Sequence, residues 1–385
     1  MDNLELLFRK NNEKCKKPIM NKRGVLECNI GSCKGLWTGN EVRQMISVSN
    51  YILKKYGAVK MPIHFVLSGS KFIDKLTYVF VECICLYLIQ QGHPVQIFMR
   101  AERDIGVEGI ESSPLLLLNA TKIKSVKLYP SKFNKDLYGK HYRKVVDDKN
   151  VNGNDVGNVY TEIDTFLKAF DVSEMFRDKV ALTIAELVGN ATEHARSDCL
   201  IDIDVTTPYE MKGDKTNNHY YGVNIAVVSF SPKRLGDDVY QKIIASTFEI
   251  EGRYAKVKDA YEYHKKHFDD QYSVEDFCNI TTFQHKISGR RDVFEGVGGT
   301  GLTKLIKSLQ SMSEAYRCYV ITGNRCVNFS LELLEYDSDG WIGFNDKNEY
   351  FEAVPNPEVT TECLINMPGT AYNLNFITKG CSDYE

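Results

Sequence analysis

Two polar residues four positions apart could act together on one ligand. In the segment IAELVGNATEHA (184–195), Glu186 and Asn190 share one face of a predicted helix, one turn apart. An asparagine oxygen can ligate a hard cation such as Mg²⁺, and a glutamate can polarise a water molecule or a hydroxyl. The pair therefore fits a magnesium–triphosphate site. The alternative is a helix whose polar residues face solvent, because this spacing alone is common.

A glycine-rich turn lies further along the chain, in FEGVGGTGLTKLIKSL (294–309), just before a helix-forming run. Glycine lets the backbone approach a phosphate closely, and the helix that follows offers free amides and the positive end of its dipole. Taken alone, the same turn could be an ordinary loop. The residues that the pattern singles out are Gly296, Gly298, Gly299, Thr300, Gly301 and Leu302.

Several elements must position these residues. Asp171 and Glu174 form a capping box that predicts a helix running to about Ala195. Alternation of apolar and polar residues predicts a half-buried strand over 199–205, and a second strand is expected over 220–230.

Two more strand features follow the glycine-rich turn. The pair Gly323-Asn324 predicts a hairpin between strands at 316–321 and 325–331. The segment MPGTAYNLNFI (367–377) then places a Gly-Thr pair, ending at Thr370, before an alternating strand.

In this order, the E-x-x-x-N helix, the strand pair, the GGTGL turn, the hairpin and the GT strand resemble the N, G2 and G3 boxes of GHKL (Bergerat-fold) ATPases. The resemblance covers roughly residues 165–378, and the N box is most similar to that of the anti-sigma factor serine kinases in the histidine-kinase-like branch. It implies an α/β (α+β) two-layer sandwich that binds ATP and Mg²⁺.

The resemblance implies a role for each motif residue. Asn190 would ligate magnesium, and Glu186 would be the catalytic base or orient a water molecule. Thr370 would help to bind adenine, whereas His194 is more typical of a helix-end packing residue than of a catalyst. The phosphates would be held by the amides around Gly298, Gly299, Thr300 and Gly301.

One box departs from the family pattern. The family has a D-x-G-x-G box whose aspartate accepts a hydrogen bond from the adenine amino group. In VVSFSPKRLGDD (227–238), Ser229 or Ser231 stands where the aspartate belongs, and the nearest glycine is Gly236. A serine hydroxyl can accept that bond only as a neutral and shorter partner, so we expect weaker and less specific adenine binding than in the family.

A long insertion, residues 232–295, takes the place of the ATP lid. It is rich in Tyr, His and Lys, and it could be helical and present a surface to a partner. Arg290 and Arg291 at its end could reach a γ-phosphate or could form a solvated turn.

Residues 1–150 are expected to form a separate, smaller α/β domain before the GHKL domain at 160–380. A strand at 62–67, a helix over 74–91 and a strand at 95–99 form a parallel crossover unit. Its similarity to the anti-sigma antagonist (STAS) fold is topological. The Asn-, Asp- and Gly-rich stretch at 145–160 is interpreted as the linker.

Residues 122–149 interleave basic and aromatic side chains. Such a mixture can follow phosphates and stack on bases, but a solvated surface whose aromatics point inward is favoured. Nucleic acid is therefore not the favoured partner. The residues concerned are Lys124, Lys127, Tyr129, Lys132, Phe133, Lys135, Tyr138, Tyr142, Arg143 and Lys144.

Composition limits the remaining classes. The net charge of −3 gives no overall attraction to nucleic acid or to anionic membrane. The N-terminus does not resemble a signal peptide, and the apolar run 76–89 is too short to span a bilayer, so a cytoplasmic protein is expected. The eleven cysteines are scattered, which favours reduced core thiols over a zinc site at Cys15, Cys28 and Cys33.

The leading hypothesis is a regulatory or defence protein in which ATP and magnesium binding, with hydrolysis or phosphotransfer, changes contacts with a partner protein. That partner could have a STAS-like fold, and a homodimer is compatible with the sequence. If the protein is an enzyme, it is an ATPase or an anti-sigma type serine/threonine kinase. The alternative is a pseudo-ATPase scaffold with a degenerate adenine site.

Overall fold

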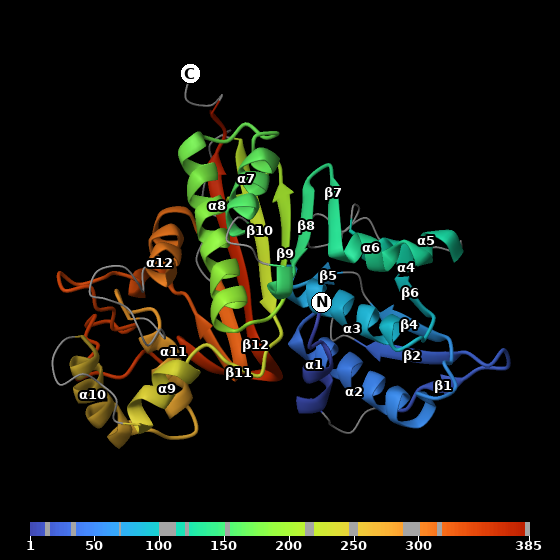
Figure 1. Ribbon diagram of the computed structural model, residues 1–385, viewed down its shortest axis with the longest axis horizontal. Coiled ribbons are helices and arrows are strands. Elements are labelled where there is room, and N and C mark those ends of the chain that lie inside the picture. The colour runs from blue at the N-terminus through green and yellow to red at the C-terminus, as the bar shows by residue number, and fades with distance from the viewer. Residues whose placement is uncertain are drawn as a thin grey trace.

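The protein is a mixed α/β protein built around two main β-sheets in this computed structural model (Figure 1). No helix among the described residues is long and apolar enough to cross a membrane. The structure describes residues 1–11, 16–31, 36–68, 71–99, 113–119, 123–150, 155–211, 219–245, 253–287, 301–313 and 318–381.

The larger sheet has six strands, and every pair of neighbours is antiparallel. The predicted strand at 220–230 is confirmed and lies near the centre of the sheet. Across the sheet, the order is β11 (Tyr319–Asn328), β12 (Thr360–Lys379), β10 (Tyr220–Ser229), β9 (Cys199–Thr206), β8 (His141–Val146) and β7 (Lys135–Tyr138).

Helices pack on both faces of this sheet, so its central strands are buried on both sides (Figure 1). Along β10, Val223, Ile225 and Val227 belong to the core beneath α8, whereas Ala226 and Val228 belong to the core on the opposite face. One face carries α7 (Asp155–Leu167), α8 (Glu174–Gly189) and α12 (Gly301–Met312), and the other carries α1 (Glu5–Lys10), α2 (Gly39–Tyr56) and α3 (Lys75–Gln90).

The N-terminal unit contains a four-stranded sheet in which β2, β4 and β6 are parallel. The predicted strand–helix–strand unit is confirmed as β4, α3 and β6. The strands in order are β1 (Ile19–Met20), β2 (Leu26–Gly31), β4 (Ile63–Ser68) and β6 (Val95–Met99); β3 (Leu36–Trp37) pairs with β5 (Lys71–Phe72), and α4 (Leu115–Leu118), α5 (Ile123–Lys127) and α6 (Tyr129–Asn134) follow.

The two sheets do not divide at residue 150, where a domain boundary was expected. Strands β7 and β8 precede that point, yet they pair into the C-terminal sheet next to β9. The core of the N-terminal unit also continues onto the sheet, where it includes Leu200, Ala226, Phe230 and Met367. The two units therefore share one apolar interface and are not joined only by a linker.

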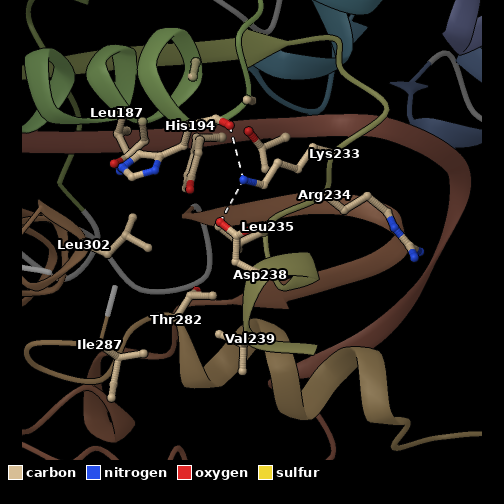
Figure 2. Close-up of a pocket in the computed structure, with 15 residues that line it drawn as sticks. Leu187, His194, Lys233, Arg234, Leu235, Asp238, Val239, Thr282, Ile287 and Leu302 are labelled. Carbon is tan, nitrogen blue, oxygen red and sulfur yellow. Dashed lines mark hydrogen bonds and ion pairs between the residues drawn. The ribbon is translucent and has the colours of Figure 1, made fainter. Parts of the chain in front are cut away.

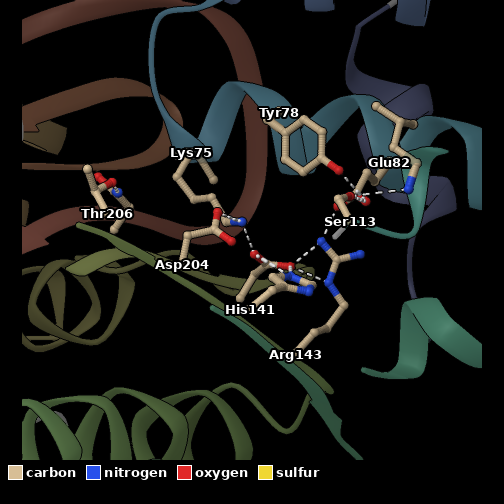
Figure 3. A network of polar contacts seen from close by, with 12 residues as sticks. Lys75, Tyr78, Glu82, Ser113, His141, Arg143, Asp204 and Thr206 are labelled. Atoms are coloured by element: carbon tan, nitrogen blue, oxygen red, sulfur yellow. Dashed lines mark hydrogen bonds and ion pairs between the residues drawn. The ribbon is translucent and has the colours of Figure 1, made fainter. Parts of the chain in front are cut away.

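A network of buried ion pairs crosses this interface (Figure 3). From α3, Lys75 contacts both Asp202 and Asp204 of β9. From β8, Arg143 contacts Asp202 and also reaches back to Glu82 of α3. All five side chains are buried, so strand β9, expected to be half-buried, has charged residues in the interior. Their charges are tolerated because each has an opposite partner.

His141 of β8 completes this network. Its two ring nitrogens lie 3.4 Å from Asp136 and 3.2 Å from Asp202. Burial opposes the protonated ring, but the Asp202 charge and the hydrogen bonds with both carboxyls prevail and raise the pKa of His141 to about 9. Burial likewise acts to raise the pKa of Asp202, but Arg143, Lys75 and His141 lower it below its ordinary value. The carboxylate of Asp202 is thus held by cations from two elements.

The basic and aromatic stretch at 122–149 largely has the inward-facing arrangement. Tyr129, Phe133 and Tyr142 are buried, and Tyr138 is exposed. Arg143 is not a surface cation, because it lies in the ion-pair network with its guanidinium 5.1 Å from the Phe133 ring centroid. The nine cysteines among the described residues are free thiols, six of them buried; Cys15 and Cys33 lie outside that part of the chain.

Two local predictions were wrong. Gly323 does not turn a hairpin; the chain continues as the single strand β11, with a register shift on each side of Gly323, whose φ is +57°. A glycine at positive φ serves a bulge as well as a turn, which is why the signal was ambiguous. Helix α8 is capped by Ser173, whose hydroxyl accepts from the Phe176 amide at 3.2 Å, and not by Asp171.

The insertion at 232–295 is helical where it is described, and it has a core of its own. Trp341 and Tyr350, from the long connection between β11 and β12, stack on each other at 5.1 Å and join Phe277 in this core. Arg325 of β11 binds Asp276 with both side chains buried, which attaches the insertion to the sheet. Its helices are α9 (Asp237–Ile244), α10 (Arg253–His264) and α11 (Val274–Thr281).

Candidate functional site

A cavity of about 140 Å³ lies where the end of α8, strand β12, helix α12 and the insertion meet (Figure 2). Three predicted site residues, Asn190, Leu302 and Thr370, line it together. These residues belong to three separate sequence motifs. The remaining walls are formed by Leu187, Ala191, His194, Ala195, Lys233, Arg234, Leu235, Asp238, Val239, Thr282, Ile287 and Tyr372.

The helix that carries Asn190 changes its winding at this residue. Helix α8 ends at Gly189, and a single π-helical turn covers Asn190–His194, where an α-helix to about Ala195 was expected. Such turns widen a helix and are often found at functional sites. Here, Asn190, Ala191 and His194 all line the cavity. His194, interpreted as a packing residue, therefore belongs to the cavity wall.

The Asn190 side chain is suited to hold a cation. It lines the cavity and makes no hydrogen bond with another described residue. Magnesium usually takes few ligands from the protein and completes its shell with water and phosphate oxygens. One amide oxygen beside an open cavity fits that requirement.

The site of Thr370 depends on a close approach between β10 and β12. Gly369 has a φ of +90°, and a Cβ atom there would collide with the Ser229 carbonyl oxygen. The hydroxyls of Thr370 and Ser229 are 3.2 Å apart. Ser229 is buried and does not line the cavity, and Ser231 is buried with its hydroxyl donating to the Ala195 carbonyl at 3.1 Å. Neither serine therefore faces the cavity.

A carboxylate does face the cavity, but it comes from the insertion. Asp238 lies in the first turn of α9, and its Oδ2 is 2.8 Å from the Lys233 ammonium. Lys233 also donates to the His194 carbonyl at 3.2 Å, while Arg234 points away from the cavity in Figure 2. Among the described residues that line the cavity, Asp238 is the only acidic one.

Glu186 lies beside the cavity and not in its lining. Its carboxylate forms an ion pair with Lys304 of α12, and the two side chains are 31% and 37% exposed. Helices α8 and α12 also meet at a hydrogen bond of 2.9 Å between Thr183 and Ser308. The predicted base is therefore engaged by a cation from the helix that follows the glycine-rich turn.

Part of the predicted phosphate site lies outside the residues that the structure describes. Gly296, Gly298, Gly299 and Thr300, together with Arg290 and Arg291, lie outside the described residues, while Gly301 is the first residue of α12. Sequence reasoning missed Lys233, Asp238 and Lys304. A signal for Lys304 was present, since it occupies the first turn of a helix that follows glycines, but nothing in the sequence indicated that Asp238 and Thr370 line the same cavity.

Two other clusters among the described residues have the spacing of metal ligands: His141 with Asp202 and Asp204, and Asp147 with Asp148 and Asp198. In the first, the Lys75 ammonium already bridges the two carboxylates. In the second, Asp198 accepts from the Asp2 amide at 2.6 Å and pairs with the N-terminal ammonium at 3.5 Å. The first cluster is therefore explained by internal ion pairs, and in the second Asp198 is already paired with the N-terminus.

Comparisons with family models, curated proteins and solved structures found no match to this chain.

Proposed function

We propose that the protein is a GHKL-type nucleotide-binding protein that holds ATP and Mg²⁺ in this cavity, and that nucleotide binding regulates its contacts with a partner protein. The observation that carries the proposal is that Asn190, Leu302 and Thr370 line a single cavity. They come from three motifs that are distant in sequence, and ligand sites are formed where such groups converge.

Asp238 takes the role that sequence reasoning gave to Ser229. The adenine amino group requires an acceptor, and a carboxylate accepts a stronger hydrogen bond than a hydroxyl does. Asp238 lines the cavity, and its partner Lys233 is about one-third exposed, so this pair can rearrange when a ligand enters. Thr370, on the neighbouring wall, would contact the same base.

Asn190 would supply the amide ligand to magnesium, whose chemistry is to neutralise the charge of the phosphates. Glu186, one turn earlier on the helix, would act as the base once it is released from Lys304. The reaction would be ATP hydrolysis or transfer of the phosphoryl group to a serine or threonine, as in the anti-sigma kinases.

The insertion provides a route from the cavity to a partner. Helix α9 contributes Asp238 and Val239 to the cavity wall, and Val239 also belongs to the aromatic core of the insertion. A ligand that moves Lys233 and Asp238 would shift this subdomain and with it the surface that a partner protein meets. The STAS-like partner and the STAS-like comparison for the N-terminal unit remain predictions.

A pseudo-ATPase scaffold is the second candidate. It is favoured by one observation, the ion pair between Glu186 and Lys304, because the ammonium occupies the carboxylate that would have to contact the attacking water. Under this alternative the cavity would bind a nucleotide without turning it over.

Calorimetry of ATP binding with and without Mg²⁺ tests the proposal. Asp238→Asn should weaken ATP binding by about tenfold, since charge-assisted bonds are roughly twice as strong as neutral ones. Asp237→Asn is the matched control, because Asp237 is adjacent but accepts from the Arg234 amide at 2.8 Å instead of lining the cavity. Absence of ATP binding by the unmodified protein would refute the proposal, and equal effects of the two variants would refute the role of Asp238.

A further inference from the structure

Lys304 occupies a position from which it can reach either of two anions. It lies in the first turn of α12, which begins at Gly301, and its ammonium contacts the Glu186 carboxylate across the interface with α8. Leu302, two residues earlier on the same turn, lines the cavity. A phosphate attracted to the start of α12 would therefore come close to the Lys304 side chain.

The Lys304–Glu186 contact is weak enough to exchange. Both side chains are about one-third exposed, and solvent screens an ion pair of this kind. A terminal phosphate carries more negative charge than a carboxylate and offers several acceptor oxygens. A lysine ammonium has three donors on a flexible stem, so it can change partners without movement of the backbone.

We propose that Lys304 binds Glu186 in the nucleotide-free protein and transfers to the terminal phosphate of a bound nucleoside triphosphate, so that the substrate itself releases the base. This inference rests on the proposed function. In hydrolysis, a water oxygen would bond to the γ-phosphorus, and the bond from that phosphorus to the β,γ-bridging oxygen would break. ADP and inorganic phosphate would leave, and the water proton would pass to Glu186.

The exchange would make the release of Glu186 depend on the presence of a terminal phosphate. With no terminal phosphate present, the Glu186 carboxylate stays paired with the Lys304 ammonium. A diphosphate or monophosphate lacks the terminal group, so it would fill the cavity without drawing Lys304 away. Lys304 is then a sensor of the third phosphate as well as a binding residue.

The first test measures the affinities of Lys304→Met for ATP, ADP and AMP. We expect about a tenfold loss for ATP and little change for ADP and AMP, because only ATP presents the terminal phosphate. Lys179→Met is the matched control, since Lys179 joins the same two helices by a bond of 3.4 Å to Ser311. Lys304→Arg, which keeps the positive charge, should restore most of the ATP affinity.

Each outcome separates the two ideas. If the unmodified protein binds none of the three nucleotides, the proposed function fails and this inference fails with it. If that protein binds ATP and Lys304→Met binds it equally well, or loses all three nucleotides to the same extent, only the role of Lys304 is overturned.

The second test follows the release of Glu186 directly. The melting temperatures of Glu186→Gln, Lys304→Met and the double variant form a cycle that measures their coupling. We expect coupling in the free protein and none with saturating ATP and Mg²⁺. Coupling that persists when ATP is bound would show that Lys304 does not change partners.

Discussion

Replacing Arg143 with methionine tests whether the buried ion-pair network holds the two units together. The guanidinium contacts Asp202 of β9 and Glu82 of α3, and all three side chains are buried. Methionine has a similar length but no charge, so Arg143→Met leaves two buried carboxylates without this cation. Breaking a buried pair in this way typically costs about 3–5 kcal/mol.

The two carboxylates do not lose equally. Asp202 keeps Lys75 and His141 as partners. Glu82 keeps only hydroxyl donors among the described residues, Tyr78 at 3.0 Å and Ser113 at 2.8 Å. Most of the cost should therefore arise at Glu82. Adding Glu82→Gln to Arg143→Met should recover most of the lost stability, whereas adding Asp202→Asn should recover less.

The assay is thermal unfolding followed by circular dichroism. With an unfolding entropy of about 2.1 cal/mol/K per residue, this chain of 385 residues should melt about 4–6 °C lower for a loss of 3–5 kcal/mol. Lys144→Met is the control. Lys144 follows Arg143 in β8 and pairs with Glu162 at 2.8 Å, but both side chains are partly exposed, so the loss of this pair should cost at most about 1 kcal/mol. The reasoning is refuted if Arg143→Met costs no more than Lys144→Met, or if Glu82→Gln gives no recovery.

Four further predictions each concern a single residue. The pKa of His141 is raised to about 9, so the stability that it contributes is present below its unfolded pKa of about 6.5 and is lost as pH rises through 9. His141→Gln should therefore reduce the change in unfolding free energy between pH 7 and 10 by up to about 3 kcal/mol, measured by thermal unfolding at each pH. Gly139→Ala should cost roughly 1–2 kcal/mol in denaturant unfolding, because Gly139 has a positive φ. Gly369→Ala should cost more, because Gly369 also has a positive φ and a Cβ atom there would collide with a backbone oxygen. Similar costs for the two variants would contradict this. Asn190→Ala should abolish magnesium-dependent nucleotide binding in calorimetry and leave the melting temperature unchanged; an unchanged affinity would exclude Asn190 as the magnesium ligand. Glu186→Ala should keep nucleotide binding and, if the protein hydrolyses ATP, slow phosphate release by about 10²–10⁴-fold. An unchanged rate of phosphate release would exclude Glu186 as the base.

The parts of the candidate site that could be predicted from the sequence are those formed by residues close together along the chain. Helical spacing placed Glu186 and Asn190 one turn apart at the end of α8, although only Asn190 lines the cavity, and the alternating pattern around Thr370 identified a strand. These patterns are local, because a helix repeats every 3.6 residues and a strand every two. The strand–helix–strand unit of the N-terminal region was predictable for the same reason.

The tertiary structure alone decided which faces of the helices and strands pack against each other. Asp202 and Asp204 alternate with apolar residues like the outer face of a surface strand, and only the packing of α3 turns that face into the interior. Ser229 matched the expected position in sequence, yet the close approach of β12 buries it while Asp238 comes to the cavity from the insertion. Periodicity shows that a strand has two faces, but the free energy of burying each face depends on partners that lie far away along the chain.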